Sequence, residues 1–306
     1  MLAVHRTFVP AKNENMTAMS WFMTTDTAEF LNVAGEFLRA EAARNSVMLT
    51  VTADLEAAGP GAGDSGMLFG WQRPEAGPLT AAFMHTPGYP VMLSGMSETA
   101  AAALARDFAG AGHQVPGVNA AQQAADAFTV AWRELTGDPV TVYRRMRLFR
   151  LARLVPPGPV PGGSARAAAG TDRDLLGEWF GAFAREVGDI PAHDHRSDID
   201  QRLGYGGITI WEDGGVPVSV ACLTRAVGGM ARVGPVYTPP ERRGRGYAGA
   251  TTAAVSQAAL DAGVREVVLY TDLANPVSNA LYERLGYRAV EDRVILSFDP
   301  PVTLHP

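Results

Sequence analysis

The sequence has little cysteine and no long apolar run. Cys222 is the single cysteine in 306 residues, which excludes an internal disulfide framework and a thiolate metal cluster and favours a reducing compartment. Because Cys222 stands in the β-branched run "VSVACLTR", we expect a buried structural thiol rather than a nucleophile. No apolar run reaches the roughly 18 residues that span a bilayer, so no membrane partner is expected.

The chain also lacks a basic excess and an apolar leader. Its formal net charge is -6, from Lys+Arg 26 and Asp+Glu 32, so a nucleic-acid partner is not expected. The first residues, "MLAVHRTFVPAKNENMTAMS", have no apolar h-region of a secretion signal. We expect a cytoplasmic protein with a flexible extension over residues 1–19, in which Met16 or Met19 is an alternative start.

Proline and glycine gather in one internal segment, "VPPGPVPGGSA" at residues 155–165. They cannot continue a helix or a central strand. Since 306 residues exceed what one core usually fills, we predict two domains, 20–154 and 166–306, joined by a linker at 155–165.

The first half reads as an α/β order of elements. We predict a helix over 25–45, strands over 46–55, 67–71, 79–85 and 90–94, helices over 97–109 and 119–136, and a strand over 140–151.

The second half has clearer boundary signals. We predict helices over 171–187, 246–262 and after Asn275, a short helix within 188–204, and strands at 207–213, 216–227, 230–238, 265–273 and from 287. Thr171 is the expected N-cap of the first helix with Asp174 as its capping-box partner, and Asn275-Pro276 begins the last helix. Gly214-Gly215 forms the hairpin turn. Both halves share this rough plan, which suggests a divergent duplication.

An arginine-glycine loop, "PPERRGRGYAGATTAAV" at 239–255, precedes a predicted helix. A helix N-terminus attracts phosphate, glycine lets the backbone approach an anion, and arginine adds charge-assisted donors. The spacing Gly244-x-Gly246-x-x-Gly249 also matches a dinucleotide fingerprint, but "TPPERR" separates it from the strand and too little chain follows for a doubly wound sheet. A solvated arginine loop or a nucleic-acid patch is the third interpretation, although nothing basic or aromatic continues it.

The order of "RVGPVYT", Arg243-x-x-Gly246-x-Ala248, "VVLYTDL" and "NPVSNALYERLGYR" resembles the GNAT superfamily of N-acetyltransferases over roughly 165–300. The resemblance implies an α/β (α+β) fold of two GNAT-like domains, each a mixed, mostly antiparallel central sheet flanked by helices. It also implies a splayed strand pair in the C-terminal domain and acetyl-CoA as co-substrate. Residues 20–150 have no R-x-x-G-x-G/A loop, so we expect a degenerate copy there that binds no coenzyme.

The resemblance assigns a coenzyme site. Gly234-Pro235 interrupts its strand and should cause a bulge, and in the family such a splay receives the pantetheine arm. The backbone N–H of Val236 would then polarise the thioester carbonyl. The residues expected to bind coenzyme are Val236, Tyr237, Thr238, Arg242, Arg243, Gly244, Arg245, Gly246, Tyr247, Ala248, Asn275 and Tyr282. Of these, Arg243, Gly246 and Ala248 match defined motif positions, whereas Arg242 and Arg245 meet either the ribose phosphate or solvent.

The resemblance also points to Tyr282 as the general acid that protonates the departing thiolate, although Tyr282 could equally be ordinary core. No Asp or Glu occurs between Ala231 and Tyr237, where many family members carry a carboxylate. The base is then expected to be Glu186, Asp272 or a water-mediated group. The alternative for each carboxylate is a surface or substrate-binding role.

The loop "DIPAHDHRSD" lies where the acceptor loop is expected. His193-x-His195 suggests a metal only weakly, because zinc takes three or four protein ligands, and we predict no metal. Asp189, Asp194 and Asp198 either attract an ammonium substrate or only solubilise the loop.

These features together predict an N-acetyltransferase that moves acetyl from acetyl-CoA to a primary amine of a small molecule by direct attack in a ternary complex. A buried Cys222 argues against an acetyl-cysteine intermediate. The alternatives are a non-catalytic acyl-CoA-binding or sensing protein and an acetyltransferase acting on a protein amine. A monomer or a homodimer is expected.

Overall fold

The computed structural model describes residues 20–59, 66–74, 77–188 and 195–298. The expected extension at 1–19, His193, Asp189 and Asp194 lie outside them. None of the helices described has the length and apolar character of a bilayer-spanning segment.

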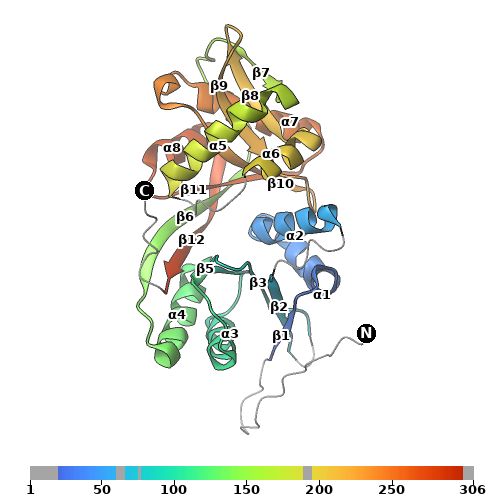
Figure 1. Cartoon of the computed structure of the whole chain (residues 1–306), viewed down its shortest axis with the longest axis vertical. Coiled ribbons are helices and arrows are strands. Elements are labelled where there is room, and N and C mark those ends of the chain that lie inside the picture. Colours follow the sequence, from blue (N-terminus) through green and yellow to red (C-terminus); the bar gives the residue numbers. More distant parts are fainter. Residues whose placement is uncertain (1–19, 60–65, 75–76, 189–194, 299–306) are drawn as a thin grey trace.

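In the described residues, one continuous sheet of 12 strands runs through both halves of the molecule (Figure 1). Its order is β1-β2-β3-β4-β5-β12-β6-β11-β10-β9-β8-β7. The pairs β4–β5 and β10–β11 are parallel and the other pairs are antiparallel. The sheet is therefore mixed and mostly antiparallel, as expected.

The strands of the first half are β1 (Trp21–Thr24), β2 (Leu68–Gln72), β3 (Ala81–His85), β4 (Val91–Leu93), β5 (Gly117–Ala121) and β6 (Thr141–Leu151). Those of the second half are β7 (Ser164–Ala167), β8 (Ile208–Asp213), β9 (Val216–Leu223), β10 (Met230–Tyr237), β11 (Glu266–Asp272) and β12 (Tyr287–Ser297).

The helices of the first half are α1 (Thr27–Ala40), α2 (Ser46–Ala58), α3 (Glu98–Ala111) and α4 (Gln122–Thr136). Those of the second half are α5 (Arg173–Val187), α6 (His195–Gly204), α7 (Tyr247–Asp261) and α8 (Pro276–Arg284). Two short 3-10 helices, η1 (Gly170–Asp172) and η2 (Pro240–Arg242), precede α5 and α7.

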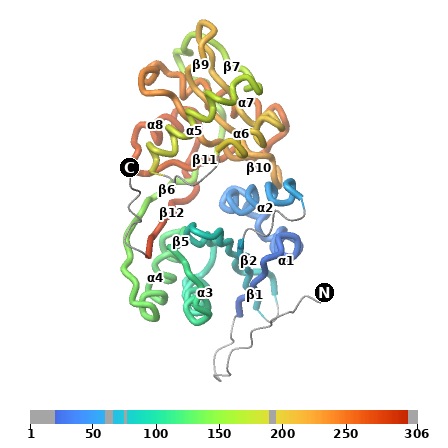
Figure 2. The backbone as a smooth tube through the Cα atoms, in the orientation of Figure 1, coloured from blue at the N-terminus to red at the C-terminus, as the bar shows by residue number. Residues whose placement is uncertain are grey.

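The two halves exchange their last strands at the centre of the sheet. β6 ends the first half but lies between β11 and β12, and β12 ends the second half but lies between β6 and β5. In Figure 2 both strands run through the join between the upper and lower parts of the molecule. The halves therefore share one sheet, and neither has its full set of strand neighbours without the other.

Helices cover both faces of the sheet. On one face, a cluster around Phe30 and Leu49 of α1 and α2 extends to Met230 and Val268 in the second half, and α5 and α6 pack on β8 and β9. On the other face, α3 and α4 pack against β12 near Val294, and α7 and α8 cover β10 and β11. The core of α1 and α2 thus crosses from one half to the other.

Residues 46–55 form a helix, and the predicted strand there is wrong. The run "SVMLTVTADL" is rich in β-branched residues, which favour strands, but short apolar runs do not separate the two structures by periodicity. In α2 the hydroxyls of Thr50 and Thr52 donate to the carbonyls of Ser46 and Met48, both at 2.8 Å. The polar groups are thereby satisfied inside the helix.

The expected cap of α5 is also wrong. Thr171 lies in η1 and α5 begins at Arg173, after Asp172. The Asp172 carboxylate accepts the Ala169 backbone N–H at 2.8 Å and binds Arg166. This network replaces the capping box predicted for Thr171 and Asp174.

Candidate active site

The strands β10 and β11 part inside the second half. Their parallel register ends at Val233 and Leu269, although β10 runs on to Tyr237 and β11 to Asp272. The pairing of β10 with β9 also shifts between Val233 and Val236, as expected for Gly234-Pro235, since proline donates no ladder hydrogen bond. An opening between two central strands therefore begins at Gly234.

The arginine-glycine loop joins this opening to the N-terminus of α7. Gly244 and Gly246 have φ of +74° and +85°, a region that only glycine adopts readily. An added Cβ on Gly244 would meet no atom within 4 Å. The loop therefore leads into the first backbone N–H groups of α7, which have no partner within the helix. Because η2 separates β10 from these glycines, they do not turn directly off the strand as a dinucleotide fingerprint requires.

Arg243 is bound by partners outside α7. Its Nη2 atom lies 2.7 Å from both carboxylate oxygens of Glu186 at the end of α5, and its Nε donates to the Thr238 carbonyl at 2.8 Å. The guanidinium also lies over the Tyr237 ring, 5.8 Å from its centroid. The side chain of Arg243 thus fastens the loop to α5. Backbone N–H groups remain at the N-terminus of α7.

The other side chains of the loop differ in burial. Arg245 is exposed, and its Nη2 approaches the Glu241 carbonyl at 3.5 Å. Tyr247 is buried and its hydroxyl donates to the Asp213 carboxylate. Arg242 is half-buried within η2.

The segment expected as a linker packs beside the same loop. The Val155 N–H donates to the Leu285 carbonyl at 2.9 Å, and the Trp211 indole N–H donates to the Gly162 carbonyl at 2.8 Å. A Cβ built on Gly246 would lie 3.7 Å from the Pro161 ring. Residues 155–163 therefore lie along one side of the arginine-glycine loop.

Tyr282 lies in the core between the sheet and α8. Its ring contacts Phe149 and Tyr287, with centroid distances of 6.4 and 6.1 Å. Burial raises the pKa of Tyr282 to about 12, so the phenol keeps its proton at neutral pH. A protonated, enclosed phenol suits a proton donor, and it equally suits a core tyrosine.

Both candidate bases are held by arginines. Glu186 is bound by Arg243, as described, and Asp272 lies 3.7 Å from Nε of Arg144, a residue of β6. The Asp272 side chain is 38% exposed. By strand alternation it lies on the face of Tyr270 and Val268, the face that α1 and α2 cover.

Asn275 has the local role predicted for it. Its Oδ1 accepts the Ser278 N–H at 3.0 Å and so caps α8. Asn279, which the sequence reading missed, donates to the carbonyls of Asp272 and Asn275, while its own Oδ1 is buried without a partner among the described residues.

Cys222 is a buried thiol, as predicted. Burial raises its pKa to about 11, which leaves it protonated and a poor nucleophile. His195 begins α6 and packs against the Phe180 ring, with centroids 6.3 Å apart. Within the described ranges, no group of His, Cys, Asp and Glu has the arrangement of a metal site.

Sequence reasoning did not single out three charged residues on the side of the sheet that α1, α2 and α6 cover. Arg202 donates to the Gly234 carbonyl at 3.0 Å, Arg144 reaches the Val187 carbonyl, and Asp54 lies on α2 of the first half. A fourth residue, Arg232, could have been found from the sequence, because it is a charged residue inside the apolar strand "MARVGPVYT". The others meet through the fold alone.

Comparisons with known proteins identify a related family and a related fold. The model of the acetyltransferase (GNAT) family matches residues 173–287. No curated protein matches the sequence. The fold resembles a GCN5-related N-acetyltransferase from Sphaerobacter thermophilus, with a TM-score of 0.60 and 18% identity over 93% of this chain and 98% of that one.

Two further structures share the fold. An acetyltransferase of the GNAT family from Colwellia psychrerythraea gives a TM-score of 0.55 and 10% identity, over 92% of this chain and 99% of that one. A Drosophila protein gives 0.63 and 12%, with the same coverage. The second half of the chain therefore contains a GNAT acetyltransferase domain, matched over residues 173–287.

Proposed function

We propose that the protein is an N-acetyltransferase that moves acetyl from acetyl-CoA to a primary amine of a small molecule. The observation that carries this proposal is the parting of β10 and β11 at Gly234, directly before a glycine loop that opens α7. An acyl thioester can enter such an opening while its phosphates meet unpaired N–H groups at a helix terminus.

The coenzyme would be held mainly by the backbone. The pyrophosphate lies against the N–H groups from Gly244 to Ala248, and exposed Arg245 and neighbouring Arg242 are within the same loop. The pantetheine arm follows residues 236–238, which have no β11 partner in the register. Asn275, the N-cap of α8, completes the set.

The reaction is a direct transfer. The amine lone pair attacks the thioester carbon, and the carbonyl electrons move to oxygen, where the Val236 N–H stabilises the oxyanion. Collapse breaks the carbon–sulfur bond, and the thiolate takes the proton of Tyr282, which regains a proton from solvent before the next turnover. The proton lost by the amine goes to a carboxylate or to water.

Asp272 is the better candidate for that base. The Glu186 carboxylate is bound at 2.7 Å through both oxygens, whereas Asp272 makes a longer contact of 3.7 Å with Arg144. A looser ion pair leaves a carboxylate oxygen able to accept a proton, directly or through a water.

We further propose a tandem GNAT arrangement with a degenerate N-terminal copy, in a cytoplasmic protein. The symmetric strand order supports it: the first half places β1 to β5 beside β12, and the second half places β7 to β11 beside β6. Each half has one parallel pair in the same place, β4–β5 and β10–β11. The first half lacks the arginine-glycine loop and so would supply a wall of the acceptor site.

A non-catalytic acyl-CoA sensor is the second candidate. It is favoured by the ion pairs that occupy both Glu186 and Asp272. Tyr282→Phe separates the candidates, because an enzyme loses turnover at unchanged coenzyme affinity whereas a sensor has no turnover to lose.

Calorimetric titration with acetyl-CoA tests the proposal. The wild type should bind, and the double variant Arg243→Ala with Gly246→Asp should not. Gly95→Asp, in the comparable loop before α3, is the control and should bind like the wild type; an added Cβ there meets no atom within 4 Å. Failure of the wild type to bind would exclude both the transferase and the sensor.

A further inference from the structure

Arg232 is a charged residue in an otherwise apolar strand. Its neighbours Ala231 and Val233 belong to the core under α7, so by alternation its side chain points to the opposite face of the sheet. Met230, on that same face, packs against α1 and α2. Arg232 pairs with Val268, one residue before β10 and β11 part. Its guanidinium therefore lies beside the opening, on the face that also carries Asp272.

The guanidinium of Arg232 is not fully satisfied. Its Nη1 atom is buried and has no hydrogen-bond partner in the part of the chain that the structure describes. Burial lowers the pKa of Arg232, and nearby Arg202 lowers it further, while Asp54 acts in the opposite direction. A buried cation without its hydrogen bonds is costly unless a partner is supplied.

Arg202 of α6 is fixed at the same opening. Its Nη1 donates to the carbonyl of Gly234 at 3.0 Å, the residue at which β10 leaves β11. This bond uses one of the five N–H donors of the guanidinium. Another donor interacts with the Cys222 thiol, and the charge of Arg202 acts on Arg232.

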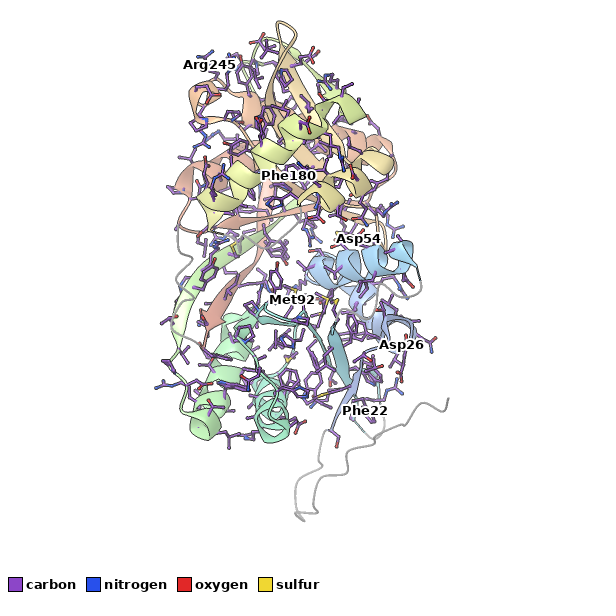
Figure 3. All side chains as sticks on the ribbon, viewed as in Figure 1. Phe22, Asp26, Asp54, Met92, Phe180 and Arg245 are labelled. Carbon is purple, nitrogen blue, oxygen red and sulfur yellow. The ribbon has the colours of Figure 1, made fainter. Side chains whose placement is uncertain are left out.

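Asp54 comes from the first half. It projects from α2, which packs against β10 (Figure 3). Its Oδ1 accepts from Nε2 of Gln201 at 3.2 Å and lies 4.0 Å from Nε of Arg225. Burial raises the pKa of Asp54, and the three arginines 202, 225 and 232 oppose that change.

The charges of this cluster do not balance. The guanidinium groups of Arg202, Arg225 and Arg232 and the carboxylate of Asp198 all act on Asp54. Among the described residues, these three cations and two carboxylates leave an excess of one positive charge. A carboxylate, with a single negative charge and two acceptor oxygens, matches that excess and the fork geometry of arginine, whereas a phosphate dianion would overcompensate it.

We propose that the acceptor is an amino acid, whose carboxylate binds Arg232 and Arg202 while its amine faces the thioester. This inference rests on the proposed function. Two residues of strand, about 7 Å, separate Arg232 from Gly234, a span that the long arginine side chain and a small amino acid cover together. The amine end then lies toward Asp272, which is on the same face. Asp54 of the first half sets the charge of the pocket and so acts as a specificity residue.

Release of coenzyme A thiol tests the substrate class directly. Proteinogenic and ω-amino acids are assayed against their amides. Phosphoethanolamine tests whether a phosphate can take the place of the carboxylate. We expect turnover with amino acids and kcat/KM lower by roughly 10- to 100-fold for the amides, since a charged hydrogen bond contributes about 1.5–3 kcal/mol. Equal rates for acids and amides, or a preference for phosphoethanolamine, would overturn the inference and leave the transferase standing.

Variants of Arg232 and Asp54 test whether these residues form the carboxylate site. Arg232→Gln should raise KM for the amino acid at least tenfold and erase its preference over the amide, with unchanged Kd for acetyl-CoA. Asp54→Asn should change KM in the opposite direction, about threefold lower, because one competing carboxylate charge is gone. Arg265→Gln is the control: its Nη2 donates to the Gly228 carbonyl at 3.0 Å, before β11 begins. Unchanged KM in both Arg232→Gln and Asp54→Asn would overturn the assignment.

Binding without turnover separates this inference from the proposed function. Calorimetric titration of the amino acids, with desulfo-coenzyme A present, measures the carboxylate site even in a non-catalytic protein. Binding that is weakened in Arg232→Gln and strengthened in Asp54→Asn supports the site if turnover is absent. Absence of amino-acid binding in the wild type overturns the site even if acetyl-CoA binds. Arg232→Lys, which keeps the charge, replaces Arg232→Gln if the latter fails to fold.

Discussion

The guanidinium of Arg243 binds both carboxylate oxygens of Glu186 at 2.7 Å, across 57 residues of sequence. This pair joins the loop before α7 to the end of α5. In the structure Arg243 therefore supports the loop.

The first prediction concerns this pair. Arg243→Ala and Glu186→Ala should each raise the Kd for acetyl-CoA about three- to tenfold, because either change releases the loop. The two changes together should raise it no more than one alone, which corresponds to a coupling of about 0.6–1.4 kcal/mol. Calorimetry measures all four proteins, and exposed Glu178→Ala on α5 is the control. If Arg243 bound the phosphate directly, Glu186→Ala would leave affinity unchanged or improve it.

Tyr282→Phe should lower kcat by roughly 100-fold, in the range of a lost general acid, with an unchanged Kd for acetyl-CoA. Since burial raises the pKa of Tyr282 to about 12, the phenol stays protonated at every pH below that value. The pH profile of the wild type should therefore show no loss of activity from Tyr282 between pH 6 and about 10. A profile that falls in that range and flattens in the variant would contradict this role.

Arg293 should be important for stability. Its side chain is 3% exposed, lies 3.0 Å from Glu291 and donates to the Leu93 carbonyl at 2.7 Å, so it joins β12 to the first half. Arg293→Met should lower the free energy of unfolding by about 3–5 kcal/mol, because Glu291 loses a buried partner.

Arg147→Met is the matched control for that change. The Arg147–Asp292 pair joins β6 to the same strand β12, yet its side chains are 30% and 49% exposed, so the loss should be about 0–1 kcal/mol. Urea unfolding of both variants measures the difference. Similar losses would show that exposure does not govern these pairs.

Gly246→Ala should lower the free energy of unfolding by about 1–2 kcal/mol, because φ is +85° at this position. Gly177→Ala, within α5, should instead stabilise by about 0.5–1 kcal/mol, since an added Cβ meets nothing within 4 Å there. Thermal unfolding compares the two. Equal and small effects would mean that the loop can relax around a side chain.

Local signals in the sequence predicted much of the second half. Gly214-Gly215 predicted the hairpin, and both glycines have positive φ, 60° and 79°. Asn275 predicted the cap of α8, and Gly234-Pro235 predicted the parting of β10 from β11. Each is a local backbone requirement, which a single residue type can express.

What could not be predicted depends on contacts between distant residues. The strand proposed for 46–55 is a helix because packing against β2 and β3, rather than β-propensity, decides its structure. The pairing of Arg243 with Glu186, and the meeting of Asp54 with Arg202, need the folded sheet. No local sequence pattern predicts that β12 pairs with β5.

The exchange of β6 and β12 has a consequence for biosynthesis. β5 emerges from the ribosome early, but its neighbour β12 ends at Ser297, near the end of the chain. Until then β5 presents an open edge, the kind of surface that pairs with other chains. A nascent chain that stops at residue 154 should therefore aggregate or bind chaperones, and synthesis of the last strand completes the folding of the first half.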